Sequence, residues 1–233
     1  MNEFLNHLKN GKTFLITSGL FLIFSLLTLF LIGVSATPIF YKLAHQKWLN
    51  IFFINLTFMG DSFFVIMMSV FVIYYLQKIK LGLKLLLGLM ITMIFVQLFN
   101  YIIFPENYHL YIESGQYILG KQSKLLFVSN TIISTHTAVV FAWATILSIK
   151  IKQSNYQKLF FILSILVAFS RLYLAPHSYL HIIMGSFVGL ISGLLVYLLQ
   201  ITFVYTLRKS TRLYQLNRVN NHNYAEFQIH NSL

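Results

Sequence analysis

The chain has 233 residues, of which 58% are hydrophobic and only 9% are charged. A soluble globular domain carries about 25% charged residues, so this composition excludes a water-exposed fold and indicates an integral membrane protein. The formal net charge is +12, but the basic residues lie in short clusters between apolar runs. That pattern follows the positive-inside rule and argues against nucleic-acid binding. The chain has no Cys, which excludes disulfides, thiolate metal sites and cysteine nucleophiles.

Apolar runs of membrane-spanning length follow one another along the chain, since a hydrocarbon core of about 30 Å needs about 20 residues. The predicted spans are about 13–34, 61–77, 85–104, 132–149, 157–175 and 179–206. The first run is longer than a signal-peptide core of about 7–15 residues, so we interpret it as a retained span. Residues 44–58 predict an interfacial helix, and Asp61 or Ser62 can cap the helix that follows. We expect an all-α integral membrane fold, a single six-transmembrane-helix bundle over residues 1–206 with a basic cytoplasmic tail at 207–233.

The distribution of basic residues predicts the orientation in the membrane. With the N-terminus inside, 12 of the 17 Lys and Arg fall on the inner side and 5 on the outer side. The inner residues are Lys9, Lys12, Lys78, Lys80, Lys84, Lys150, Lys152, Lys158, Arg208, Lys209, Arg212 and Arg218. This bias predicts a multi-pass protein of the plasma (inner) membrane with both termini cytoplasmic. The long connection 105–130 then faces outward.

Small residues in the sixth predicted span indicate where it packs against another helix. They are Gly185 and Gly189, with Ser186 and Ser192 beside them. Small side chains let two membrane helices approach closely. We therefore predict a helix–helix contact along this face.

Three polar clusters interrupt the apolar runs, and the predicted topology puts all three on the outer side. They are Ser134-Thr135-His136-Thr137, Ser170-Arg171, and His177 with His181. A helix N-terminus favours a bound anion, and the guanidinium of Arg171 suits phosphate oxygens. An Arg near a membrane boundary is costly enough to indicate a functional role. Histidines can exchange protons or attack phosphorus near neutral pH, so the clusters indicate phosphoryl chemistry.

Two of these clusters carry a family resemblance. Ser-Arg at 170–171, five residues and then His177 matches Ser-Arg-x5-His, the third signature of the type 2 phosphatidic acid phosphatase family. That family shares its site with vanadium haloperoxidases. Residues 134–137 are similar to its second signature, Pro-Ser-Gly-His-Thr, with Ile133 and Thr135 in the Pro and Gly places. The chain thus resembles a member of this superfamily from the bacterial membrane lipid phosphatase branch.

A third stretch extends the resemblance. Residues 56–61, Leu-Thr-Phe-Met-Gly-Asp, resemble the Leu-Thr-x-x-Gly-Asp motif common before the second span of bacterial members. The order and spacing of the motifs agree with the predicted spans and orientation. The resemblance covers about residues 45–200.

The resemblance implies a metal-free lipid phosphatase without a cofactor. It makes His177 the nucleophile that takes the phosphoryl group, and His136 the group that protonates the leaving oxygen and later activates water. It assigns Ser134, Thr135 and Arg171 to phosphate binding. The implied partners are a lipid phosphate and the membrane lipids, with no nucleic acid.

The chain departs from the family pattern at two signatures. The first signature, Lys-x6-Arg-Pro, is degenerate here, with Asn100, Asn107 and Tyr108 in its places, so two phosphate-binding cations are missing. The third signature ends in Asp four residues after the nucleophile, and His181 occupies that place. A neutral His181 can orient His177 in place of the Asp, but it supplies no counter-charge.

Charged residues of the predicted outer loop offer one form of compensation. Glu106 and Glu113 fall on the same side as His177, as do Lys121 and Lys124. We hypothesise that one of the two acids serves His177 and that one of the two lysines replaces a lost cation. This hypothesis is motivated by the predicted position of these residues on the same side of the membrane as His177.

The leading prediction is a membrane lipid phosphate phosphatase that acts on an envelope lipid phosphate or diphosphate through a phosphohistidine intermediate. This prediction includes an enzyme whose turnover is weakened. Two alternatives stay open. One is a catalytically inactive family member that binds lipid phosphate or serves as a membrane assembly protein. The other is a metal site, because His177 and His181 are four residues apart and share a helix face, with His136 as a third ligand.

Overall fold

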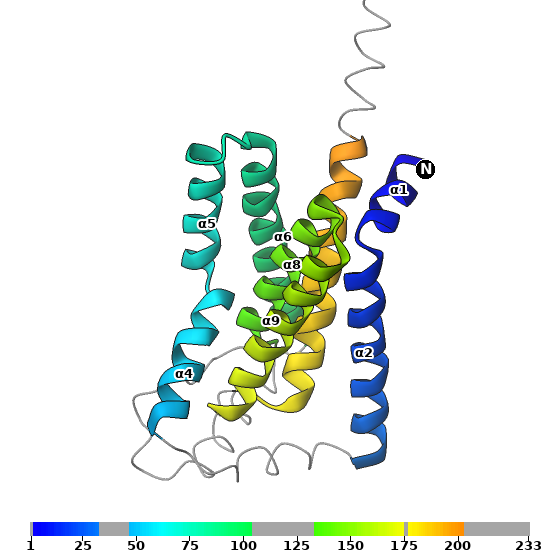
Figure 1. Cartoon of the computed structure of the whole chain (residues 1–233). Coiled ribbons are helices and arrows are strands. Elements are labelled where there is room, and N and C mark those ends of the chain that lie inside the picture. Colours follow the sequence, from blue (N-terminus) through cyan, green and yellow to red (C-terminus); the bar gives the residue numbers. More distant parts are fainter. Residues whose placement is uncertain (1, 33–46, 104–132, 175–176, 203–233) are drawn as a thin grey trace, which may run out of the picture.

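The structure is a computed structural model of the chain, and it describes residues 2–32, 47–103, 133–174 and 177–202. Every regular element within these ranges is helical. In chain order they are α1 (Asn2–Asn10), α2 (Lys12–Ile32), α4 (Lys47–Thr57), the 3-10 turn η2 (Phe58–Gly60), α5 (Ser62–Tyr74), α6 (Ile79–Ile103), α8 (Thr135–Ile151), α9 (Ser154–Tyr173) and the last helix, Tyr179–Thr202 (Figure 1). The all-α membrane bundle predicted from the sequence is confirmed.

Only some of the described helices are long enough to cross a membrane by themselves. Four described helices, α2, α6, α9 and the last helix, are each long and apolar enough to cross a membrane. Helix α4 with η2 and helix α5 meet that condition only together, and the pair is bent by 61°. Helix α8 is apolar but has 17 residues. The protein is thus a multi-pass membrane protein in which one candidate span is bent and another helix is short.

The segment predicted as an interfacial helix packs against α9 in the structure. Residues 44–46 lie outside the described part, and α4 runs beside α9 as one half of the bent pair (Figure 1). Phe53 is 6% exposed, and its ring centroid lies 5.5 Å from that of Phe169 and 4.6 Å from that of Tyr173. The Tyr173 hydroxyl also donates to Asn50 Oδ1 at 2.8 Å. Helix α4 therefore buries its aromatic face against protein, which the interfacial interpretation did not foresee.

Helix α8 forms the centre of the bundle. All its side chains from Thr137 to Ile146 are buried, so it is apolar on every face, as expected for a helix surrounded by others. The last helix packs closely on it, because a Cβ added at Gly189 would clash with the carbonyl oxygen of Ala138. One turn earlier, a Cβ at Gly185 would lie 2.7 Å from the carbonyl oxygen of Ser134. The predicted close contact at the two glycines is confirmed.

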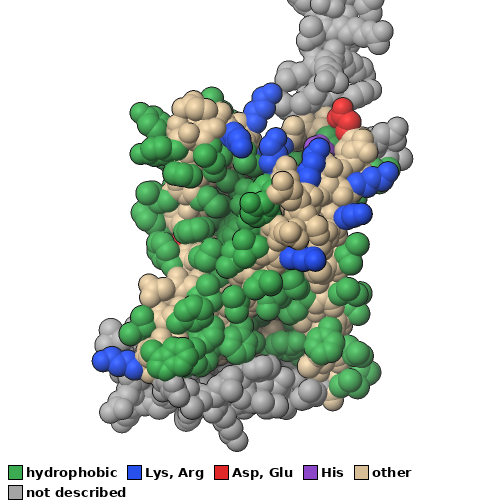
Figure 2. Space-filling model, in the orientation of Figure 1, with side chains coloured by type: hydrophobic (Ala, Val, Ile, Leu, Met, Phe, Trp, Pro, Cys, Tyr) green, Lys and Arg blue, Asp and Glu red, His purple; other side chains and the backbone are tan. Residues whose placement is uncertain are grey.

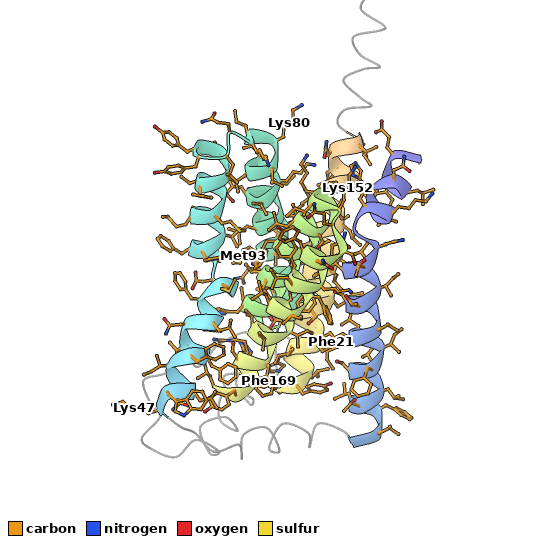
Figure 3. All side chains as sticks on the ribbon, viewed as in Figure 1. Phe21, Lys47, Lys80, Met93, Lys152 and Phe169 are labelled. Carbon is orange, nitrogen blue, oxygen red and sulfur yellow. The ribbon has the colours of Figure 1, made fainter. Side chains whose placement is uncertain are left out.

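The two ends of the bundle differ in charge. Figure 2 shows most of the described Lys and Arg side chains gathered toward one end of the molecule, with apolar side chains covering the face below them. Lys80 and Lys152 lie at this basic end, whereas Lys47 and Phe169 lie toward the opposite end (Figure 3). The short helix α1 is also at the basic end (Figure 1).

A buried glutamine holds the N-terminal helices against the bundle at the basic end. Gln157 of α9 is 1% exposed. Its Oε1 accepts from the backbone N–H of Phe14 at 3.2 Å, and its Nε2 donates to the carbonyl oxygen of Asn10 at 2.7 Å. Both ends of the amide are therefore used to fix the junction of α1 and α2.

Candidate functional site

The second predicted signature lies at the start of α8, at the opposite end of that helix from the basic Lys150. Ser134 is the N-cap residue, fully buried, but its side chain makes no capping hydrogen bond. Its hydroxyl instead pairs with the Thr137 hydroxyl at 2.9 Å. Because Ser134 does not occupy the N–H groups of the first turn, that turn keeps donors and a partial positive charge for an anion. Thr135, the first residue of the helix, is half-buried beside these groups.

His136 is the most accessible of the three predicted site histidines. Its side chain is 26% exposed, and its Nε2 lies 3.9 Å from Oδ2 of Asp61. Arg171 also lies within electrostatic reach of this imidazole. One imidazole thus lies near both a carboxylate and a guanidinium.

The third signature begins in the last turn of α9. Ser170 donates to the carbonyl oxygen of Val167 at 2.6 Å, so its hydroxyl is used within its own helix. Arg171 is 2% exposed and donates through Nη1 to Oγ1 of Thr57 at 3.3 Å. Its Nε has no hydrogen-bond acceptor among the described residues. A buried donor of this kind is costly unless a ligand satisfies it.

His177 lies in the connection between α9 and the last helix, outside both. It is 4% exposed, and neither ring nitrogen has a hydrogen-bond partner in the part of the chain that the structure describes. Burial lowers the pKa of His177 well below its usual value, and the nearby Arg171 lowers it further. His181 and His136 add smaller contributions in the same direction, so both lie close to His177. The imidazole is therefore neutral, the form in which it can act as a nucleophile.

His181 lies in the first turn of the last helix and packs against His177. The two ring centroids are 5.7 Å apart at 78°, an edge-on contact between imidazoles. The carbonyl oxygen of His181 accepts from the backbone N–H of Ser134 at 3.1 Å, which joins the second and third signatures. Among the described residues no three His, Cys, Asp or Glu side chains gather so that they could hold a metal ion. The alternative of a metal site therefore has no ligand set within that part of the chain.

The degenerate first signature is only partly described. Asn100, near the end of α6, is 9% exposed, and its Oδ1 accepts from the backbone N–H of Ile133 at 3.4 Å. It thus supports the chain just before Ser134, although it carries no charge. Several residues named in the sequence analysis lie outside the described residues: Glu106, Asn107, Tyr108, Glu113, Lys121 and Lys124.

The junction of α4 and α5 contributes groups that sequence reasoning did not assign to the site. Asp61 caps α5, as predicted, by accepting from the N–H of Phe63 at 2.8 Å. It also faces His136, and Thr57 contacts Arg171. A Cβ at Gly60 would lie 2.5 Å from the carbonyl oxygen of His136, so only glycine allows this approach. The motif at 56–61 was the sequence feature that pointed to this junction, because its Thr, Gly and Asp contact Arg171 or His136.

Comparison with known proteins identifies the family and the fold. Residues 79–205, more than half of the chain, match the model of the PAP2 superfamily. The crystal structure of Aquifex aeolicus LpxE is similar to this structure with a TM-score of 0.54 and 19% sequence identity, covering 70% of this chain and 93% of that chain. At this identity the likeness concerns the fold. No curated protein matches the chain. The family predicted from the motifs is confirmed: the chain is a multi-pass membrane protein that belongs to the PAP2 superfamily.

Proposed function

We propose that the protein is a lipid phosphate phosphatase that removes phosphate from an envelope lipid phosphate or diphosphate. The observation that carries this proposal is a gathering of buried polar atoms without partners among the described residues. Nε of Arg171 and both ring nitrogens of His177 are of this kind, and they lie close to the first turn of α8. Each such atom costs about 1–3 kcal/mol when unsatisfied. A phosphate group, with its several acceptor oxygens and its phosphorus, can satisfy them together.

The proposed reaction has two steps, transfer of the phosphoryl group to His177 and its hydrolysis. In the first, a ring nitrogen of His177 forms a bond to phosphorus while the bond from phosphorus to the lipid oxygen breaks, and His136 gives that oxygen a proton. In the second, His136 takes a proton from water as the water oxygen attacks phosphorus. The bond to His177 then breaks and inorganic phosphate leaves. Arg171, the first-turn N–H groups of α8 and the hydroxyls of Ser134 and Thr135 hold the phosphate oxygens.

The surroundings support a lipid as substrate. The start of α8 lies at the opposite end of the helix from the lysine-rich end, which the positive-inside rule assigns to the cytoplasm. We therefore propose that both termini are cytoplasmic and that the site faces the outer leaflet of the plasma membrane. A head group at that leaflet reaches the site while its acyl chains stay in the bilayer.

One observation favours a second candidate function, lipid phosphate binding without turnover. His181 holds the place of the family Asp, and it presents an imidazole edge to His177 at a centroid distance of 5.7 Å. A neutral imidazole does not offset the positive charge that His177 gains as it attacks phosphorus. Weak turnover follows from the first candidate, and saturable binding with no release follows from the second.

A phosphate-release assay on purified protein separates the two candidates. Wild type is compared with His177→Ala on a lipid phosphate monoester and a lipid diphosphate, with malachite green as the readout. Release by wild type that is abolished in His177→Ala supports the phosphatase. His7→Ala is the matched control, because His7 lies in α1 at the basic end and should leave release unchanged. Saturable lipid binding with no release by wild type overturns the phosphatase and supports the binding protein.

A gain-of-function variant sharpens the same experiment. His181→Asp returns a carboxylate to the place beside the nucleophile. We expect at least tenfold faster release, because the carboxylate orients His177 and neutralises its developing charge. Unchanged release in this variant would show that the missing Asp does not limit turnover.

A further inference from the structure

Among the described residues, Asp61 is the acid that lies at the site. The other described acid, Glu3, belongs to α1 at the opposite, basic end. Oδ2 of Asp61 lies 3.9 Å from Nε2 of His136, which is within ion-pair range but too long for a hydrogen bond. Arg171 lies within electrostatic reach of the same carboxylate. The carboxylate therefore lies beside the imidazole that handles the leaving-group proton in the proposed function.

The carboxylate is held in this position by its own backbone. Oδ1 of Asp61 accepts from the N–H of Phe63 at 2.8 Å, which leaves Oδ2 for His136. The preceding Gly60 packs against the backbone of His136 without room for a side chain. The indole N–H of Trp143, in α8, donates to the carbonyl oxygen of Met59 at 3.1 Å. The junction thus contacts α8 at two places, His136 and Trp143.

The same junction also supports the phosphate-binding cation. Thr57 lies one turn before Asp61, at the end of α4, and its hydroxyl accepts from Nη1 of Arg171 at 3.3 Å. One side of the junction therefore contacts Arg171, and the other side faces His136. The junction, which contains no residue of the three signatures, thus lies next to two signature residues, Arg171 and His136.

We propose that Asp61 is the positioning residue of His136, which it orients and whose imidazolium form it stabilises while that histidine protonates the leaving oxygen. This inference rests on the proposed phosphatase function. The carboxylate itself takes no proton. Catalytic hydrogen bonds often tighten only when substrate is bound, and a distance of 3.9 Å lies within reach of such a contraction. Among the described residues, the charged and titratable groups near His136 are Asp61 from the α4–α5 junction, Arg171 from α9 and His177 from the connection after α9.

The test separates the charge of Asp61 from its role as a helix cap. Asp61→Asn keeps the size and the capping ability, since Asn and Asp cap helices about equally well, but it removes the charge. Asp61→Ser also keeps a cap without a charge and serves as the matched second variant. We expect kcat for a lipid phosphate with an alkoxide leaving group to fall at least tenfold in both variants, with KM and the thermal unfolding midpoint unchanged.

The leaving group provides a readout that a purely structural role would not move. A nitrophenyl-type phosphate leaves without protonation, so both Asp61 variants should release nitrophenol in the first turnover at the wild-type rate, before His136 is needed as a base. Wild-type kcat for both substrates overturns the inference. So does an equal loss in the first turnover of both substrates, because that indicates a general distortion of the site.

A second measurement works without turnover. The imidazole titration of His136, followed by NMR in micelles and assigned with His136→Gln, should move to lower pH in Asp61→Asn than in wild type, because the carboxylate stabilises the imidazolium form. Coincident titrations overturn the inference. Absence of phosphate release by wild type counts against the proposed function, and the titration then decides the coupling of Asp61 to His136 by itself.

Discussion

Gly185 joins the last helix to the start of α8, and replacing it with Ala should open the site by a calculable amount. The new Cβ would lie 2.7 Å from the carbonyl oxygen of Ser134 and 3.2 Å from Cβ of Thr137, whereas ordinary contact begins at 3.4 Å. Neither atom belongs to a flexible side-chain end, so neither can rotate away. The two helices must separate by about 0.7 Å at this point to restore ordinary contact.

This separation acts on the contact between the second and third signatures. The hydrogen bond from the N–H of Ser134 to the carbonyl oxygen of His181, now 3.1 Å, would lengthen to about 3.8 Å, beyond hydrogen-bond range. Its loss costs about 1 kcal/mol, and overpacking costs about 1–3 kcal/mol more. A misplacement of about 1 Å can lower a rate about 100-fold. We therefore expect kcat to fall on the order of 20-fold in Gly185→Ala.

The assay is phosphate release together with thermal unfolding of the purified protein in detergent. Gly19 supplies the matched control, because a Cβ at that position in α2 would meet nothing within 4 Å. Gly19→Ala should keep wild-type release and gain at most about 1 kcal/mol of stability from helix propensity. If Gly185→Ala releases phosphate like wild type and unfolds at the same temperature, the tight contact that this reasoning requires is refuted.

Three further predictions concern charge and hydrogen bonding. Arg171→Lys loses the planar fork, so we expect kcat/KM to fall at least tenfold in the steady-state assay, and equal kcat/KM would contradict the phosphate role. Gln157→Leu leaves the buried N–H of Phe14 unpaired and should destabilise the fold by about 1–3 kcal/mol, measured as thermal unfolding. Burial, and then the charge of Lys84, lower the pKa of His7. The unfolded chain therefore binds this proton more readily, so stability should fall as the pH drops below about 6.5. His7→Gln should weaken this dependence without abolishing it, because the pKa of His177 is lowered as well.

Part of the candidate site could be anticipated because its residues are specified by local sequence. Ser134, His136, Arg171 and His177 stand in signature spacing. The structure places the first three at helix ends and His177 in the connection just before the last helix. Asp61 was predicted only as a helix cap. Its contact with His136 joins residues 75 positions apart, so no spacing rule along the chain could reveal it.

The place of α4 was also beyond local patterns. An apolar helix with scattered polar residues fits both a membrane interface and a protein surface. The partner decides between them, and here Phe53 meets Phe169 and Tyr173 of α9. The sequence shows that these aromatic residues are present, but it does not show which of them contact one another.

By itself the amino-acid sequence determined the membrane class, the helical segments and the family, because hydropathy over about 20 residues and motif spacing are properties of contiguous chain. It also determined where the lysines gather, which gives the expected orientation. Only the tertiary structure decided which carboxylate faces which histidine, and how closely the last helix approaches α8. Those features depend on packing between distant segments, where a glycine such as Gly60 or Gly185 sets the distance of approach.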